Sequence, residues 1–143
     1  MTWLYDDPES LNYEFIDEPI RNLVKQINDS DWLKTEESCC GHPVNEPSAW
    51  GTNAELYLRV VVCELVQLKR LFFMVDRLRE PFKNFMGHVS LCYDRTDKLG
   101  SHWYLSCKYN KFEYRSLAIE FMEIAFKESS IIVVNGIGCG CVD

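Results

Sequence analysis

The sequence has few basic residues and no long apolar run. Its 143 residues include 15 Lys and Arg against 22 Asp and Glu, a formal net charge of -7. Because a surface that binds the nucleic-acid backbone is basic, we do not expect a nucleic-acid partner. Apolar runs such as Leu71 to Val75 are far shorter than the ~20 residues of a transmembrane helix. The first residues also lack the basic and apolar sections of a secretory signal, so we expect a cytoplasmic protein with no membrane contact.

Cysteine pairs with the Cys-x-x-Cys spacing are also missing. The seven cysteines are odd in number, and several fall inside strand patterns, which favours reduced thiols over a disulfide framework. A zinc site is the alternative, since thiolate and imidazole groups are the usual zinc ligands. Its ligands would come from Cys39, Cys40, His42, Cys139 and Cys141.

The length and the hydrophobic content of the sequence predict a single domain over residues 1–143. With 47% hydrophobic residues, a chain of this length can bury a sizeable core without disulfides. We divide it into an aromatic and acidic arm (1–16), an α-β unit (17–54), a larger α-β block (55–134) and a tail rich in Gly and Cys (135–143).

Hydrophobic periodicity predicts the elements of the α-β unit. Asp17 can cap a helix in which Ile20, Leu23, Val24 and Ile27 share one face. A first strand then follows the turn and ends at Cys40, because Gly41 and Pro43 interrupt it.

In the larger block the spacing of the hydrophobic residues changes four times between the period of a strand and that of a helix. We predict a strand at 55–63, a helix that Pro81 stops, two hairpin strands at 88–94 and 102–109, a helix around 117–125 and a strand at 131–134. The order β-α-β-β-α-β is that of a ferredoxin-like sheet with both helices on one face. The fold class is therefore α+β, with the extra α-β unit extending the sheet or covering its open face.

The stretch Ser38-Cys39-Cys40-Gly41-His42 combines nucleophiles, an imidazole and a glycine at a strand end. It can supply a nucleophile and a base, but no third group that orients the imidazole is visible in the sequence. Buried thiols beside a loop histidine are the alternative. Whether the protein is an enzyme therefore stays open.

A second polar group is expected on the hairpin. His88 and His102 fall on the non-apolar faces of neighbouring strands, where with Arg59, Arg95 and Tyr104 they can line a pocket. The alternative is a solvated sheet face. Aromatic stacking of a ligand can come from Trp50, Trp103 or Tyr104.

Residues 27–41 resemble a passage of the wybutosine-synthesising tRNA methyltransferase family. In that passage a short helix and an Asn-Ser turn precede a Ser-Cys-Ser-Gly-Arg signature, which here reads Ser38-Cys39-Cys40-Gly41-His42. The segments 102–107, 118–126 and Asn135-Gly136-Ile137 resemble that family's later strand, helix and Ser-Gly-Ile close. The resemblance implies an S-adenosylmethionine site near Ser38 to His42.

Three functional hypotheses follow. The first is a binding protein for a small molecule, such as a nucleotide or a nucleotide-derived molecule, held near the Ser38 to His42 loop. The second is an S-adenosylmethionine-dependent, RNA-modifying methyltransferase-like enzyme, and the third is a zinc-binding or protein-interaction module. A homodimer is compatible with each of them.

A substitution at His42 distinguishes a ligand-binding histidine from a core histidine. If His42 binds a ligand, His42→Ala weakens binding by about 1–3 kcal/mol, because a buried polar partner is left unpaired, and barely changes the melting temperature. Titration calorimetry and thermal unfolding of the same variant measure both quantities. A lower melting temperature with unchanged binding would contradict the assignment.

Overall fold

The structure, a computed structural model, describes residues 16–41, 55–84, 87–96 and 101–134. The order of its helices, 3-10 turns and strands is α1 (Glu18–Asp29), β1 (Leu33–Cys39), β2 (Glu55–Val62), η3 (Leu65–Gln67), α2 (Leu68–Asn84), β3 (His88–Tyr93), β4 (His102–Lys108), η4 (Phe112–Tyr114) and α3 (Arg115–Ile131). The protein is α+β, as the sequence predicted. No helix in these ranges is long and apolar enough to span a membrane.

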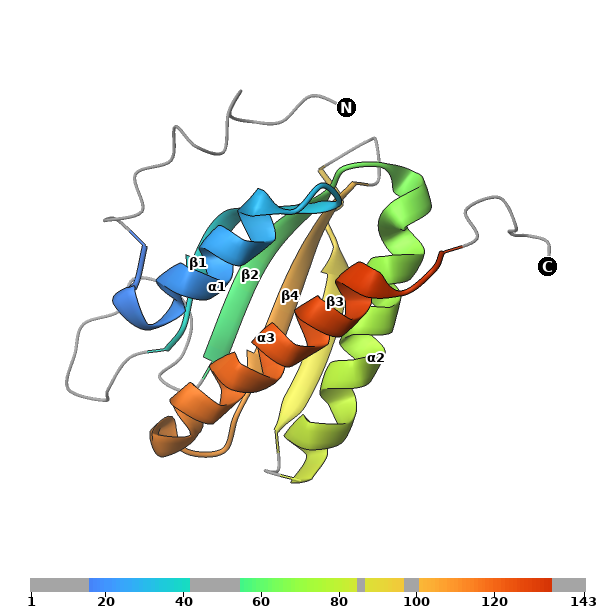
Figure 1. Cartoon of the computed structure of the whole chain (residues 1–143). Helices are drawn as coiled ribbons and strands as arrows, with labels where there is room; N and C mark the ends of the chain where they lie inside the picture. The colour runs from blue at the N-terminus through green and yellow to red at the C-terminus, as the bar shows by residue number, and fades with distance from the viewer. Residues whose placement is uncertain (1–15, 42–54, 85–86, 97–100, 135–143) are drawn as a thin grey trace.

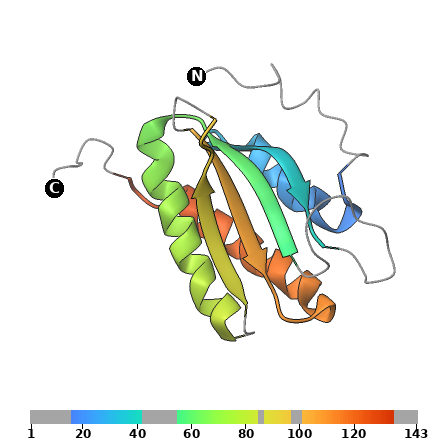
Figure 2. The same cartoon turned by 180° about the vertical axis from the view of Figure 1, so that it is seen from behind.

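The four strands form one antiparallel sheet in the order β1-β2-β4-β3. All three helices lie on the same face of this sheet (Figure 1), and from behind the sheet is seen without a helix in front of it (Figure 2). We call these the helix face and the helix-free face. The hairpin of β3 and β4 confirms the pairing expected from the alternation of their residues.

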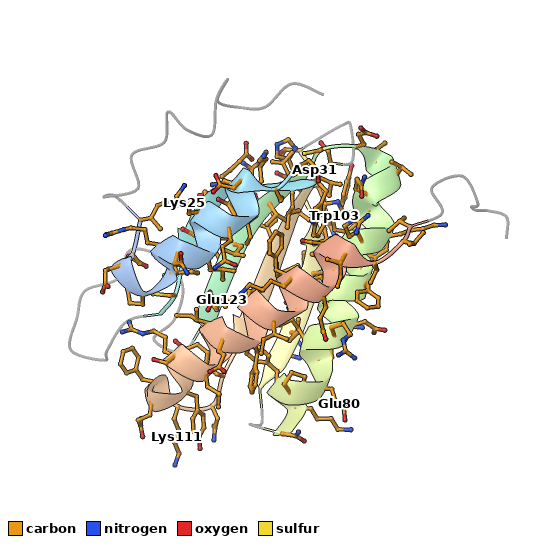
Figure 3. All side chains as sticks on the ribbon, in the orientation of Figure 1. Lys25, Asp31, Glu80, Trp103, Lys111 and Glu123 are labelled. Carbon is orange, nitrogen blue, oxygen red and sulfur yellow. The ribbon has the colours of Figure 1, made fainter. Side chains whose placement is uncertain are left out.

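The core lies between the sheet and the helices. Strand alternation turns Leu56, Leu58 and Val60 of β2 toward the helix face, where they are fully buried. Polar contacts also join the helices: the amide of Gln26 on α1 donates to the carboxylate of Glu123 on α3 at 3.0 Å, and Figure 3 shows Glu123 on the side of α3 that faces α1.

The ferredoxin-like order is not reproduced in detail, because the strand expected at 131–134 is wrong. Ile131 is the last residue of α3, and residues 132–134 belong to no strand. The hydroxyls of Ser129 and Ser130 donate to carbonyls one turn earlier, at 2.6 and 2.8 Å, and so remain part of the helix. Moreover β1 already occupies the edge beside β2 that a last strand would need. The N-terminal unit thus extends the sheet.

The sequence also predicted that Pro81 ends the helix before β3, and this prediction is wrong. The helix continues to Asn84 with Pro81 inside it. Phe82 is 2% exposed and packs edge-on against Phe121 of α3, with ring centroids 6.1 Å apart. Burying this ring offsets part of the ~3 kcal/mol that an interior proline costs a helix.

Truncating a core leucine of β2 should destabilise the protein strongly. Leu58 is fully buried in a central strand, so Leu58→Ala should lower the free energy of unfolding by about 2–5 kcal/mol. Leu65→Ala is the matched control because Leu65 is 55% exposed, and it should change stability by less than about 0.5 kcal/mol. Urea unfolding measures the free energy of unfolding of both variants. Similar decreases in the two would contradict the placement of Leu58 in the core.

Candidate polar site on the helix-free face

Arg59 of β2 lies at the centre of a polar cluster on the helix-free face. Its guanidinium nitrogens lie 2.6 Å from Glu36 Oε1 and 2.7 Å from Asp94 Oδ2, with Glu37 Oε2 at 3.8 Å. The side chains of Glu36 and Asp94 are only 5% and 4% exposed. One cation therefore holds carboxylates from β1 and from the end of β3, the two edge strands of the sheet.

A β-bulge in β1 places two consecutive glutamates beside this cation. The register of β1 and β2 shifts between Thr35, which pairs with Val60, and Glu37, which pairs with Arg59. At a bulge two residues of one strand oppose a single residue of the other. Both Glu36 and Glu37 consequently approach Arg59, whereas regular alternation would send one of them to the helix face.

His102 and Tyr104 of β4 complete the cluster. His102 Nε2 lies 3.2 Å from Glu36 Oε1, and the Tyr104 hydroxyl donates to Asp94 Oδ2 at 3.5 Å. The Tyr104 ring stacks on that of Tyr57, with centroids 6.0 Å apart and planes at 26°. The guanidinium carbon of Arg59 lies 5.6 Å from the centre of the Tyr104 ring. The cluster thus combines ionisable groups with a pair of aromatic rings.

The two carboxylates closest to Arg59, those of Glu36 and Asp94, differ in their electrostatics. Hydrogen bonds from Arg59 and Thr96 lower the pKa of Asp94 to about 2. Burial raises the pKa of Glu36 above its ordinary value, although His102 and Arg59 oppose this. Asp94 is therefore a fully bonded anion, whereas burial disfavours the charged form of Glu36.

Glu36 also has an unused hydrogen-bonding atom. Its Oε2 is buried and has no hydrogen-bond partner among the described residues. A buried acceptor left unpaired costs about 1–3 kcal/mol, so such atoms are rare in folded proteins. This oxygen can accept a hydrogen bond from a donor that the described part of the chain does not supply.

The Ser38 to Gly41 stretch lies at the end of β1 and is held by its backbone. The Tyr109 hydroxyl donates to the Cys40 carbonyl at 2.8 Å, and Arg115 donates to the Gly41 carbonyl at 3.1 Å. Asp17 Oδ2 lies 3.4 Å from the Cys40 amide nitrogen. Gly41 has a φ of 89°, which glycine adopts without strain.

The Cys40 side chain belongs to the core. It is fully buried, and burial raises the pKa of its thiol to about 12. Because the thiolate is the reactive form, Cys40 is a poor nucleophile at neutral pH. The described cysteines, which are Cys39, Cys40, Cys63, Cys92 and Cys107, are all free thiols.

The structure brings together three of the residues expected to bind a ligand: Arg59, His102 and Tyr104. His88 lies on the same face but at the far end of β3, where it pairs with Lys108. Trp103 lies on the helix face, between the rings of Phe72 and Tyr93. His42, Trp50, Cys139 and Cys141 lie outside the described residues, which contain no group of three or more His, Cys, Asp and Glu side chains able to hold a metal ion.

Sequence reasoning missed Glu36, Asp94 and Tyr57. A signal for the first two was the arginine in the middle of a strand that has no other charged residue after Glu55, because a buried guanidinium needs carboxylate partners. Alternation places Tyr57 on the same face as Arg59.

A scan against protein-family models and searches of curated proteins and of solved structures found no match for this chain.

The ion pair of Asp94 should appear in the acid stability of the protein. The folded-state pKa of about 2 lies below the ordinary 3.8, so this carboxylate stabilises the fold above about pH 4, and the contribution is lost as pH falls toward 2. Asp94→Asn should be less stable than the unmodified protein at pH 7, and the difference should shrink between about pH 4 and 2. Urea unfolding across this range measures it.

Asp76→Asn is the matched control, since the side chain of Asp76 is 79% exposed and lies 3.8 Å from Arg79. Its stability should follow that of the unmodified protein at each pH. A constant difference for Asp94→Asn from pH 7 to pH 2 would contradict the assigned pKa.

Proposed function

We propose that the protein binds a small planar molecule with N–H donors, such as a nucleoside, on the helix-free face of its sheet. The observation that carries this proposal is the buried Oε2 of Glu36, for which the described residues supply no hydrogen-bond partner, in the same cluster as the stacked rings of Tyr57 and Tyr104. A nucleobase offers the matching features: flat faces that stack on aromatic rings, and ring or exocyclic N–H groups that donate to a carboxylate.

The charges of the cluster favour a neutral or cationic ligand. Glu36, Glu37 and Asp94 surround one guanidinium, so carboxylates outnumber the permanent cation. Like charges in a half-buried site repel strongly, which disfavours a polyphosphate. A nucleoside, or a nucleoside that carries a positive group, suits this site better than a nucleoside triphosphate.

The site also adjoins the end of β1, near which the sequence predicted a ligand. Cys39 pairs with Tyr57 across the two strands, and Ser38 comes directly after Glu37 in β1. A molecule lying over Tyr57 is therefore close to the point where the Ser38 to His42 stretch begins. Burial raises the pKa of Tyr57 to about 12, so its phenol stays protonated at neutral pH and can donate a hydrogen bond.

S-adenosylmethionine has the same chemistry, since it joins an adenosine to a sulfonium cation. It is the methyl donor implied by the resemblance to the wybutosine-synthesising family, and binding of this molecule is the first requirement of a methyltransferase-like activity. It therefore serves as one probe beside adenosine, guanosine and ATP.

The test is titration calorimetry of the full chain with these four probes. We expect at least one of adenosine, guanosine and S-adenosylmethionine to bind, and ATP to bind more weakly than adenosine. Glu36→Gln should weaken binding about tenfold, or about 1.4 kcal/mol, because the charged acceptor is lost. Circular dichroism checks that the variant remains folded.

Glu37→Gln is the control, because Glu37 is 48% exposed and its carboxylate lies 3.8 Å from Arg59. It should leave the affinity within about twofold of the original, as weak exposed pairs contribute little. Equal losses in the two variants, tighter binding of ATP than of adenosine, or no binding of any probe would each overturn the proposal.

A further inference from the structure

The outer edge of the sheet next to helix α2 has backbone groups that point away from the protein. The Asp94 amide donates to the His102 carbonyl at 3.0 Å, so these two residues form a hydrogen-bonded pair. Hydrogen-bonded and non-bonded pairs alternate along an antiparallel ladder. Cys92 and Ser90 therefore bond to β4, whereas the N–H and C=O groups of Val89 and Leu91 point outward from β3.

Strand β3, all of whose residues the structure describes, itself carries none of three common protections against pairing. Natural edge strands carry a lysine, a proline or a bulge that keeps other strands away. The sequence of β3 is His-Val-Ser-Leu-Cys-Tyr, and its register with β4 is regular from His88 to Tyr93. Among the described residues, no strand pairs with the outer side of β3.

Helix α2 flanks the same edge and exposes both apolar and charged groups. A hollow of about 470 Å³ lies between α2 and the sheet, with Phe72, Asp76 and Arg79 on one side and Leu91 on the other. Phe72 is 47% exposed, and the side chains of Asp76 and Arg79 are 79% and 60% exposed. The edge thus combines backbone groups that can pair, an apolar hollow and two opposite charges.

Two contacts show how α2 is aligned with β3. At one end Phe72 packs against Trp103, which pairs with Tyr93, with ring centroids 5.7 Å apart (Figure 3 shows Trp103 beside α2). At the other end the Gly87 amide donates to the Phe82 carbonyl at 2.7 Å. The middle of α2, which includes Asp76 and Arg79, therefore lies level with Ser90.

We propose that β3 and α2 form the interface of a homodimer, in which β3 pairs with β3 of a second copy about a two-fold axis beside Ser90. In this register Val89 opposes Leu91 of the second copy and Leu91 opposes its Val89, so their outward N–H and C=O groups bond to each other. A two-fold axis requires such a self-complementary surface. The same axis places Asp76 across from Arg79 of the second copy and Arg79 across from its Asp76.

The second copy fits better than an unrelated peptide because both the backbone and the charges complement themselves. The dimer joins the two sheets into one of eight strands, a common way to satisfy an exposed edge. Its helix-free faces then form one continuous surface, which leaves the cluster around Arg59 outside the interface.

A charge placed on this edge tests the interface in the full chain. Tyr93→Lys should weaken dimerisation at least ~tenfold, since lysine is the residue that natural edges use to prevent pairing. Ile124→Lys is the matched control, because Ile124 of α3 is 48% exposed and Tyr93 is 43% exposed. Sedimentation equilibrium over a range of concentrations should show a dimer that Tyr93→Lys weakens and Ile124→Lys retains.

Disulfide trapping tests the register. In the proposed dimer His88 opposes Cys92 of the second copy in a non-bonded pair, with Cα atoms ~4.5 Å apart, which a disulfide can bridge. His88→Cys should form a covalent dimer on mild oxidation, with the 88–92 link identified by mass spectrometry. Lys108→Cys is the control, because Lys108 neighbours His88 but lies on the inner strand β4.

A monomer at all concentrations would overturn the proposal, as would a dimer that Tyr93→Lys leaves intact. Efficient linking of Lys108→Cys with none at position 88 would also reject this interface. If β3 binds an extended peptide of another protein instead, the chain alone sediments as a monomer and no 88–92 link forms.

Discussion

Packing all three helices on one face leaves the other face of a four-stranded sheet without a helix to cover it. That face is stabilised by one guanidinium. Arg59, on a central strand, contacts Glu36 of the edge strand β1 and Asp94 at the end of the opposite edge strand. Since Glu36 also contacts His102 on β4, a single connected set of polar side chains joins β1, β2, β4 and the residue that follows β3. Removing Arg59 would leave two buried carboxylates without their cation, a far larger cost than the loss of an exposed ion pair.

The helices and the hairpin could be predicted because their patterns are strong and local. Ile20, Leu23, Val24 and Ile27 repeat with the period of a helix, and all four are buried in α1. The failures have tertiary causes. Phe82 finds a partner ring beyond Pro81, so the helix continues, and the β-branched run from Ile131 cannot join the sheet beside β2 because β1 is already there. Neither cause can be read from a window of sequence.

The polar cluster could be predicted in part, because some of its residues follow a local pattern. Alternation along β2 and β4 places Arg59, His102 and Tyr104 on one face, and the structure brings them together. The bulge at Glu36 is different, because a one-residue shift of register leaves no mark in the composition of a strand. The opposite holds for Cys40, which stands out in the sequence although its side chain is buried in the core. Its carbonyl accepts a hydrogen bond from Tyr109, and Arg115 donates to the next carbonyl, that of Gly41.

The two proposed surfaces meet at the end of β3, where Asp94 of the ligand site follows the strand directly. The interface depends on the outward backbone of Val89 and Leu91, whereas the ligand site depends on side chains that point to the helix-free face. Asp94, directly after β3, is bonded to Arg59 and Thr96, so the cluster fixes the end of the strand whose edge would pair with a second copy. A ligand that orders the cluster can therefore strengthen dimerisation, and by thermodynamic linkage dimerisation then strengthens ligand binding by the same factor. If the backbone is already rigid without ligand, ligand binding and dimerisation are independent equilibria. Loss of one then leaves the other unchanged.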